Sequence, residues 1–468
     1  MSSLKFGTSG LRGLVSKLTD AVCFGYSTAF LEHLVAQGVA PGSTVLIGQD
    51  LRDSSPRIAE ACMAAVDALG MTVENCGTLP TPALALRAMT LKVPAIMVTG
   101  SHIPADRNGL KFYRPDGEID KSDEAEIVRR VAGAGFERQA GIRHDMLITA
   151  YDDYFSRCES VLSWPALRGK KIGVYCHSSA ARELMLALLT ALDAEAHAFG
   201  LSDEFVPIDT EALSKEDLTF ANATVAENRL DALISTDGDA DRPMLFDEKG
   251  QFVRGDLLGI LTAKFLGADA VVTPVTSTSA IEQSGLFKSV VRTKVGSPFV
   301  IAGMEEAKRQ GGRIVVGFEA NGGVLLGSAV EVAGGMLTAL PTRDAMLPML
   351  SVLGLGLREG KTISELVEAL PARFAMSGRL EHVGPEKTGP FLEKLQDAAF
   401  QASYFDGKGA IRAVDKIDGV RFVFDSGDTV HYRASGNAPE LRCYAETGDS
   451  AKSAALLDWG LAKAAATL

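Results

Sequence analysis

The sequence predicts an α/β protein with three similar α/β domains, whose sheets are mixed and mainly parallel, followed by a smaller C-terminal α+β domain. One observation behind this prediction is that short β-branched runs alternate with longer runs of helical apolar spacing. A second is that these strands are continuously apolar, as expected when helices cover both faces of a parallel sheet. A third is the length, because 468 residues exceed what one core usually holds.

The alternation of strand and helix can be followed along the chain. Strands are predicted at 44–48, 171–175, 230–234, 270–275 and 313–317, and helices at 56–66 and 182–189. After about Pro371 the composition shifts, and antiparallel strands are expected there. A helix over 451–466 is predicted to finish the chain.

Candidate domain boundaries follow from breaks in this pattern. Residues 164–170 (WPALRGK) read as a linker before a new strand, and 252–256 close a hairpin before a helix. No short repeat period is visible, so a solenoid is not expected. The predicted domains are 1–155, 156–255, 256–370 and 371–468.

Composition limits the function. The net charge of −12 argues against nucleic acid as a partner, but a local basic pocket for a small anionic substrate remains compatible with it. Six scattered cysteines without metal spacing indicate reduced core thiols in a cytoplasmic protein. No apolar signal segment opens the chain, and its longest apolar run, 345–357, contains Pro348 and is too short to span a bilayer. We expect a cytoplasmic protein with no membrane partner.

Three polar loops follow apolar strands, where ligands bind in open α/β sheets. They lie at 99–104, 235–242 and 318–323, and a fourth, 432–440, lies in the predicted last domain. The second places Asp237, Asp239 and Asp241 at alternate positions, where their charges repel one another unless a cation compensates. A solvated acidic turn is the plain structural alternative.

An EF-hand is the rival metal site for these aspartates. Glu248 stands at its twelfth position, but its sixth position, which requires glycine, is Arg242, and a strand rather than a helix precedes it. We therefore reject the EF-hand. Three aspartates behind a strand fit Mg²⁺ with an open position for a phosphate oxygen.

Ser101 has several possible roles. A serine hydrolase requires Gly-x-Ser-x-Gly, but Ile103 stands at the fifth position, and His102 is too close in sequence to act readily as the base for Ser101. A turn or helix-capping hydroxyl is the structural alternative. Beside a Mg²⁺ site, a third role is a serine that carries a phosphoryl group, with Lys111 neutralising charge.

Basic and polar residues indicate an anionic substrate. The glycine-rich loop 6–13 ends near Arg12, and its amides suit a phosphate, although such loops alone are weak evidence. Residues 433–437 (RASGN) offer donors that match a phosphate monoester, with an ordinary surface turn equally compatible. Glu319 and Asn321 are either strand-end surface groups or partners for sugar hydroxyls.

Taken in order, the segments FGTSGLRG, VTGSHIPADRNGLKFY, TDGDADR, GFEANGG and RASGNAPE resemble the α-D-phosphohexomutase superfamily over essentially the whole chain. The resemblance is strongest to its bacterial phosphomannomutase branch. It implies four domains around a central cleft, each contributing a loop. It also implies Mg²⁺-dependent interconversion of mannose 1-phosphate and mannose 6-phosphate, with hexose 1,6-bisphosphate as intermediate and activator.

The resemblance also implies roles for individual residues. Ser101 is the implied phosphoserine, and its oxygen joins Asp237, Asp239 and Asp241 as metal ligands. Arg12, Lys111 and His102 are the implied catalytic groups. The implied substrate-binding residues are Arg242, Gly296, Ser297, Glu319, Asn321, Arg433, Ser435, Gly436 and Asn437.

The chain departs from the superfamily pattern at two positions. Gly323 stands where many relatives have a histidine, so His102 or Lys111 is expected to carry more of the general base's work. Asn437 stands where threonine is common. Neither change removes Ser101 or a metal ligand, and we expect an active enzyme.

Other functions stay open at this point. A metal-dependent sugar-phosphate phosphatase would use the same serine and aspartates but release phosphate. A non-catalytic protein would bind hexose phosphates and leave Ser101 unmodified. Among mutases, a glucose or dual-specificity enzyme, and less so a glucosamine-phosphate enzyme, compete with the mannose enzyme. The sequence is compatible with a monomer or a homodimer.

Overall fold

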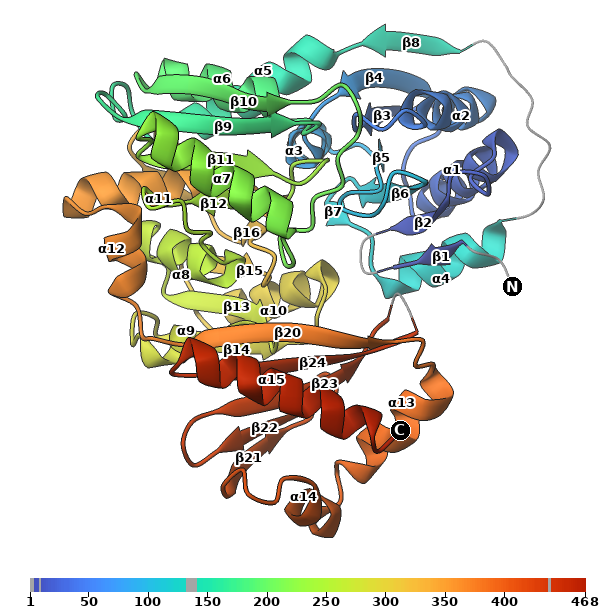
Figure 1. The fold of residues 1–468 in the computed structure, drawn as a ribbon. Helices are drawn as coiled ribbons and strands as arrows, with labels where there is room; N and C mark the ends of the chain where they lie inside the picture. The colour runs from blue at the N-terminus through green and yellow to red at the C-terminus, as the bar shows by residue number, and fades with distance from the viewer. Residues whose placement is uncertain (1–3, 8–9, 132–140, 437–438) are drawn as a thin grey trace.

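The computed structural model describes residues 4–7, 10–131, 141–436 and 439–468. The chain forms four successive units, each built on its own main sheet with helices packed against it (Figure 1). The first three units have mixed sheets and the fourth is antiparallel, which confirms the predicted fold class. The domain boundaries proposed from the sequence stay predictions.

The first unit contains the strand that precedes Ser101. Its strands are β1 (Lys5–Phe6), β2 (Leu11–Leu14), β3 (Thr44–Gln49), β4 (Thr72–Thr78), β5 (Ala95–Val98), β6 (Arg107–Arg114), β7 (Gly117–Glu118) and β8 (Ile142–Asp145). Its helices are α1 (Asp20–Ala36), α2 (Ser55–Ala68), α3 (Thr81–Leu91), α4 (Lys121–Arg130) and α5 (Leu147–Glu159). The sheet order is β1-β2-β6-β5-β3-β4-β8, with β7 paired to β6. Strands β5, β3, β4 and β8 are parallel neighbours, and β6 begins the antiparallel side.

The second unit has the smallest of the four main sheets. Its elements are β9 (Lys171–His177), α6 (Arg182–Ala191), β10 (Glu195–Leu201), α7 (Lys215–Asn228), β11 (Ala232–Thr236) and β12 (Pro243–Phe246). The order is β10-β9-β11-β12, and only β12 is antiparallel. The strand predicted at 230–234 begins two residues later, because the Leu230 amide instead closes the end of α7 by bonding the Val225 carbonyl.

The third unit contains the loop 318–323, with Glu319 and Asn321. Its strands are β13 (Ala270–Pro274), β14 (Ser289–Thr293), β15 (Val315–Phe318), β16 (Val324–Leu326) and β19 (Leu340–Asp344), with a separate hairpin of β17 (Val330–Val332) and β18 (Gly335–Leu337). Its helices are α8 (Gly255–Phe265), α9 (Ala280–Gln283), α10 (Ser297–Arg309), α11 (Met346–Glu359) and α12 (Ile363–Glu368). The strand predicted at 313–317 begins only at Val315, since the amides of Arg313 and Ile314 bond the Asp269 carboxylate instead.

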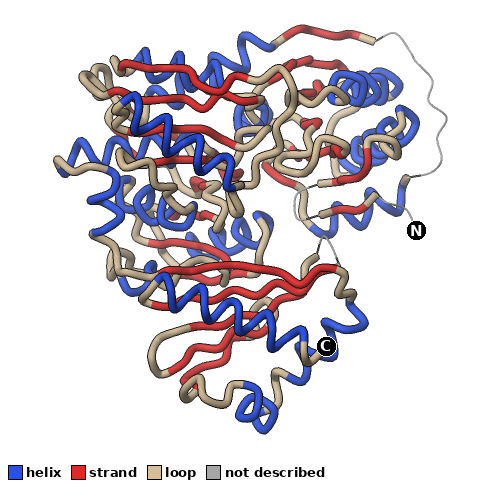
Figure 2. Tube along the Cα trace, in the orientation of Figure 1, coloured by secondary structure: helices blue, strands red, loops and turns tan. Residues whose placement is uncertain are grey.

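The fourth unit is antiparallel throughout its sheet. The order β20-β24-β23-β22-β21 uses β20 (Phe374–Glu381), β21 (Ile411–Asp415), β22 (Val420–Phe424), β23 (Thr429–Ala434) and β24 (Glu440–Thr447). Its helices are α13 (Pro385–Lys394), α14 (Ala398–Tyr404) and α15 (Ser450–Ala465). Helix α15, capped by the Asp449 side chain, lies along β20 and β24 (Figure 2), close to the predicted range.

The apolar cores explain how the units are joined. One continuous cluster of buried side chains runs through the first three units and includes Leu46, Ile172 and Val271. The fourth unit has its own cluster, built around residues such as Phe422. The long apolar run of the sequence is α11, and the run from Met346 to Gly356 is buried in the shared core. Within the described residues, no helix has the length and apolar character needed to cross a bilayer.

The cysteines are as the sequence predicts. All six are buried free thiols distributed over three of the four units. They pack as small apolar groups in the cores, and none is joined to another in a disulfide within the described residues.

A buried hydrogen bond links the first and third units. The Tyr154 hydroxyl on α5 donates to Asp344 Oδ1 at 2.6 Å, and the same carboxylate oxygen accepts the amides of Met346 and Leu347 at the start of α11. Both side chains are buried. Asp344 therefore caps a core helix and fixes the end of β19.

Replacing Tyr154 with phenylalanine tests this link. The change keeps the ring but removes the donor to a buried carboxylate, so we expect a loss of roughly 1–3 kcal/mol in the free energy of unfolding. Urea unfolding followed by circular dichroism measures it. Tyr151→Phe, on the same helix but partly exposed, is the control and should change little. Equal effects of the two changes would contradict the assignment.

His431 is a buried titratable group in the fourth unit. Its Nε2 donates to the Asp418 carbonyl at 2.6 Å, and its ring stacks on Tyr444 with centroids 5.3 Å apart. Burial lowers the pKa of His431 to about 4, and the charge of Arg421 adds to the shift. The fold therefore holds this imidazole neutral.

This pKa predicts a pH dependence of stability. Because the folded pKa lies below the ordinary value of about 6.5, stability is full at pH 7 and is lost as the pH falls from 6.5 toward 4. Between pH 7 and pH 5 we expect His431 to account for a loss of about 2 kcal/mol. Urea unfolding of His431→Gln at both pH values should show that loss removed. The exposed control His144→Gln should keep it.

Candidate active site

Residues from all four units line one cleft of about 330 Å³. From the sequence-predicted set the lining includes Arg12, His102, Arg242, Glu319, Asn321, Arg433 and Ser435. Lining residues that the sequence analysis did not single out include Asp209, Glu211, Arg343, Arg379, Arg442 and Tyr444. Ser101 and the three aspartates are buried and lie next to this lining: Ser101 contacts His102, and Asp241 contacts Arg343. The structure thus brings the predicted loops to one place.

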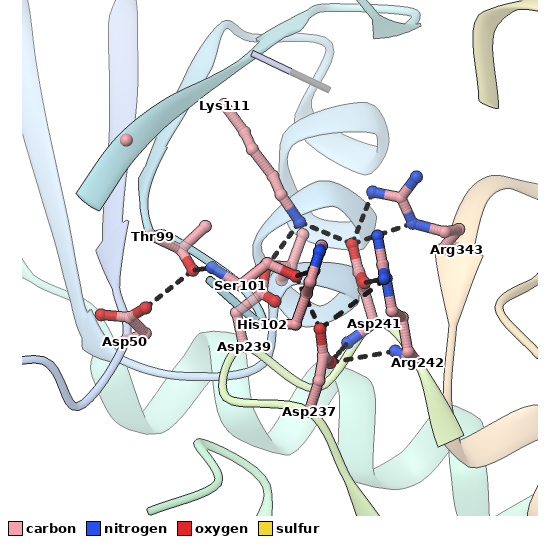
Figure 3. Close-up of polar contacts among 12 residues, drawn as sticks. Asp50, Thr99, Ser101, His102, Lys111, Asp237, Asp239, Asp241, Arg242 and Arg343 are labelled. Carbon is pink, nitrogen blue, oxygen red and sulfur yellow. Dashed lines mark hydrogen bonds and ion pairs between the residues drawn. The ribbon is translucent and has the colours of Figure 1, made fainter. Parts of the chain in front are cut away.

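Ser101 lies in the loop after β5 in a left-handed backbone conformation, with φ of 53°. Such a φ is unfavourable for a residue with a Cβ atom, so the surroundings must hold it. The Ser101 amide donates to Thr99 Oγ1 at 2.7 Å, and Thr99 Oγ1 donates to Asp50 Oδ2 at 2.7 Å (Figure 3). The side chain is only 1% exposed.

Arg52 organises this loop, and the sequence analysis missed it. Its guanidinium is buried and fills the space where a side chain at Gly100 would lie, 2.6 Å from Arg52 Cζ. It donates to the carbonyls of Ser101 (2.8 Å), Ile103 (2.5 Å), Pro104 (2.8 Å) and Arg107 (2.8 Å). One signal for it was present, since Asp50 and Arg52 directly follow the predicted strand at 44–48.

Asp237, Asp239 and Asp241 occupy the turn between β11 and β12. All three are buried, and one oxygen of each lies within 4.8 Å of the others. Asp239 Oδ1 and Asp241 Oδ1 have no hydrogen-bond partner among the described residues. Burial, and then the charges of Asp239 and Asp241, raise the pKa of Asp237 well above its usual value. This cluster therefore holds three sets of hard oxygen atoms so close together that full ionisation requires a compensating cation.

Ser101 and Lys111 complete the cluster. Ser101 Oγ donates to Asp237 Oδ2 at 2.6 Å (Figure 3). Lys111 Nζ lies 2.6 Å from Asp239 Oδ2 and 2.5 Å from Asp241 Oδ2. Unpartnered, buried carboxylate oxygens next to a serine oxygen are the donor set that Mg²⁺ prefers, so these residues fit a magnesium ion.

Cationic and neutral groups face the cluster from the cleft. Burial, and then the charges of Arg242 and Arg343, lower the pKa of Arg12 to about 10. His102 Nδ1 lies 3.3 Å from Ser101 Oγ. Burial, and then Arg242 and Arg12, hold the pKa of His102 well below its usual value, so its imidazole is neutral. The site thus combines fixed positive charge with an uncharged base.

Arg343, at the end of β19, is a second residue that the sequence analysis missed. It lies between Asp241 of the second unit and Glu319 of its own, and it contacts both carboxylates (Figure 3 shows the Asp241 contact). Arg343 lies outside the motifs at 235–242 and 318–323. The register of β19 against β16 brings it to the loop that carries Glu319. Sequence alone offered no signal for this contact.

The fourth unit presents two arginines side by side. Arg433 and Arg442 are directly paired positions on β23 and β24, and both line the cleft. Arg433 Nε donates to Asp418 Oδ2 at 2.7 Å. Like charges in register destabilise a sheet, so an anion between them would relieve the repulsion. Gly436 follows Ser435 in the adjoining loop, while Asn437 falls outside the described residues, as do Thr8 and Ser9 of the first loop.

The segment around Gly296 and Ser297 lies differently from the other predicted loops. Ser297 begins α10, is buried and donates its hydroxyl to Glu118 at 2.6 Å. Val295, two residues earlier, lines the cleft in its place. Thr210 Oγ1 of the second unit donates to the Asn321 carbonyl at 2.9 Å, and this bond joins the second unit to the 318–323 loop of the third.

Comparison with known proteins gives a consistent result. Models of the phosphoglucomutase/phosphomannomutase family match α/β/α domain I at residues 3–138, domain II at 152–250 and domain III at 254–374. The chain is 46% identical over 466 residues to a phosphomannomutase of Sinorhizobium fredii, covering 98% of each chain. It is 46% identical over 449 residues to a phosphomannomutase of Salmonella muenchen, covering 95% of this chain and 92% of the relative.

A solved structure shares the whole fold. The crystal structure of a phosphoglucomutase/phosphomannomutase family protein from Burkholderia thailandensis aligns with a TM-score of 0.76 at 23% identity. The alignment covers 98% of this chain and 97% of that one. All four units therefore have counterparts in that structure.

The aspartate cluster predicts cation binding. Asp239→Asn keeps the shape of the side chain but removes a charge, so we expect the affinity for Mg²⁺ to fall roughly tenfold or more. Isothermal titration calorimetry measures it. The control is Asp231→Asn, the same change at a partly exposed aspartate paired with Lys170. If both variants bound Mg²⁺ as the unmodified protein does, the cluster would not be the cation site.

Proposed function

This chain belongs to the phosphoglucomutase/phosphomannomutase family, and from that premise we propose that it is a phosphomannomutase that interconverts mannose 1-phosphate and mannose 6-phosphate. As a member of the family it is an enzyme, an isomerase that works by phosphoryl transfer. The substrate assignment is supported by the 46% identity to phosphomannomutases over nearly the whole chain. Its partner is then a small hexose phosphate, and we place its activity in the cytoplasm.

One observation carries the mechanism. The Ser101 hydroxyl lies 2.6 Å from a carboxylate of the three-aspartate cluster and borders a cleft with several arginines. A plain structural serine would not need a buried anionic cluster on one side and a cationic cleft on the other. In the proposal Ser101 carries the phosphoryl group as phosphoserine.

The proposed cation is Mg²⁺. Asp237, Asp239 and Asp241 would hold it together with an oxygen of the group on Ser101. When bound, Mg²⁺ would neutralise negative charge on the transferring phosphoryl group. Lys111, now held between Asp239 and Asp241, and Arg12 add positive charge at the same point.

The phosphoryl transfer needs a path for one proton. The bond between phosphorus and Ser101 Oγ breaks as a new bond forms to the free hydroxyl of the hexose phosphate. In the proposal, Nδ1 of His102, which borders the cleft beside Ser101, accepts the proton that this hydroxyl loses. Ser101 Oγ, 3.3 Å away, then takes the proton from the same imidazole. This proton relay would replace a general base at position 323, where many relatives have a histidine and this chain has Gly323.

The opposite end of the substrate lies across the cleft. Arg433, Ser435 and Gly436, with Asn437 and Arg442, would bind the phosphate that is not transferred. Arg242, close to Asp237 and Asp241, would face the transferred group instead. Glu319 and Asn321 would accept hydrogen bonds from sugar hydroxyls. Gly296 and Ser297 start α10 beside this wall, and through Val295 they would shape it rather than bind phosphate directly.

The product of the first transfer is a hexose 1,6-bisphosphate, which we propose as intermediate and activator. It turns in the cleft so that Ser101 takes back the other phosphate. The four predicted domains would each contribute one wall. The loop of the fourth unit, which binds whichever phosphate is distal, must release and rebind during this turn.

Other activities stay as alternatives. A glucose or dual-specificity mutase needs the same site, because mannose and glucose differ only at the 2-hydroxyl, and a glucosamine-phosphate mutase is a weaker candidate. A phosphatase would let water attack the phosphoserine.

Product analysis tests the proposal. Purified protein is incubated with mannose 1-phosphate, Mg²⁺ and a trace of hexose 1,6-bisphosphate, and products are followed by phosphorus NMR. We expect mannose 6-phosphate from the unmodified protein and at least about a thousandfold less from Ser101→Ala, because the nucleophile is absent. Glucose 1-phosphate and glucosamine 1-phosphate are run in parallel.

Each outcome has a distinct meaning. Faster turnover of mannose 1-phosphate than of the other two sugars supports the phosphomannomutase. Faster turnover of another sugar would overturn the substrate assignment but keep the mutase. Release of inorganic phosphate alone would identify a phosphatase and overturn the mutase.

A further inference from the structure

We propose that Arg343 is a positioning residue that ties the sugar-binding carboxylate of Glu319 to the metal loop and thereby sets the hexose ring at a fixed distance from Ser101. The inference rests on the proposed function and deepens it, because it assigns a role in the same site to a residue outside the recognised motifs.

The guanidinium of Arg343 bridges two units. Nε and Nη2 donate to Asp241 Oδ2 at 3.0 and 2.8 Å, and Nη1 donates to Glu319 Oε2 at 3.0 Å. The residue is 2% exposed, and both carboxylates are buried. Charged hydrogen bonds of this kind are short and directional, and the planar fork of arginine can serve two carboxylates at once.

The backbone that carries Arg343 is fixed on both sides. Asp344 accepts the Tyr154 hydroxyl and caps α11, which is buried in the shared core. Thr342 donates its hydroxyl to Glu118 at 2.8 Å. The backbone of Arg343 is therefore fixed, and its side chain holds the carboxylates of Asp241 and Glu319 in place.

Gly323 makes room for this side chain. A Cβ atom at position 323 would lie 2.6 Å from Arg343 Cδ and 2.7 Å from Cγ, too close for any real contact. The backbone of Gly323 is not in the left-handed region, unlike that of Gly322. The neighbouring arginine alone therefore excludes a side chain here, and Gly323 is the counterpart of Arg343.

These contacts link the two ends of the reacting geometry. Glu319 lines the cleft that would hold the sugar, while Asp241 belongs to the cluster that contacts Ser101. A group that holds both fixes the separation between the sugar-binding point and the transferred phosphoryl group, and such alignment contributes strongly to rates. Arg343 moves no proton, since a guanidinium stays charged, so its effect is on orientation.

The first test compares two arginines that each bridge two carboxylates. Arg343→Lys keeps the charge but cannot bond Asp241 and Glu319 together, so we expect kcat to fall roughly tenfold or more. KM should rise by less than about threefold, because the distal phosphate is held elsewhere. The matched control is Arg87→Lys. Arg87 is 7% exposed and bridges Glu74 (3.0 Å) and Asp153 (3.1 Å) away from the cleft, and its change should leave kcat and KM as they are.

A double-mutant cycle tests the steric part. Gly323→Ala should lower kcat as Arg343→Lys does, because the new methyl group displaces the arginine. Arg343→Ala removes Cγ and Cδ and leaves only Cβ, at 3.0 Å, so adding Gly323→Ala to it should cost much less than the same change in the unmodified protein. Thermal unfolding of each variant shows whether the protein is folded. The intact mass gives the fraction in which Ser101 is phosphorylated, and kcat is corrected for both.

The same cycle is measured as mannose 6-phosphate binding by calorimetry in Ser101→Ala protein, which needs no turnover. Non-additive effects on kcat and binding support the proposal. Additive effects, or Arg343→Lys within about twofold of the unmodified kcat, overturn it. Non-additive binding with no mutase activity in the unmodified enzyme would keep the positioning role and overturn the proposed function.

Discussion

The repulsion among three buried carboxylates is the constraint on which the rest of the site depends. Asp237, Asp239 and Asp241 are held in one turn, and their charges in a low-dielectric interior are unfavourable without compensation. Compensation comes from different units, with Lys111 from the first and Arg343 from the third. The cluster therefore requires the units to be packed together, and the site exists only in the assembled chain.

The cores fit this requirement. The first three units share one apolar cluster, so the loops that carry Ser101, the aspartates and Glu319 are held on a common support. The fourth unit has a separate cluster and reaches the cleft through its sheet. The loops around Ser101 thus share one rigid support. In the proposed function the fourth unit, which has its own core, would adjust to release and rebind the distal phosphate.

The sequence was informative wherever a function lies within one local motif. Ser101 and the aspartate turn each follow an apolar strand, and this alone predicts that they meet at one edge of the fold, where the structure brings them into contact. Arg343 and Arg442 could not be predicted in this way, because their places depend on strand register. Arg52 follows a predicted strand, but its carbonyl partners lie far away in sequence. The segment at Gly296 shows the reverse case, where a motif match placed a hydroxyl in the cleft but the fold turned it toward Glu118. The predicted elements overlap the observed ones. Two strands begin later than predicted because the amides at their predicted starts bond elsewhere, Leu230 to a backbone carbonyl and Ile314 to the Asp269 carboxylate.

The burial of Ser101 has a consequence for regulation. With 1% of its surface accessible, Ser101 offers almost no area to the surface of another protein, and Arg52 holds its loop in place. In the proposed function, a phosphoryl group on this residue would therefore be exchanged with small molecules that enter the cleft rather than with another protein.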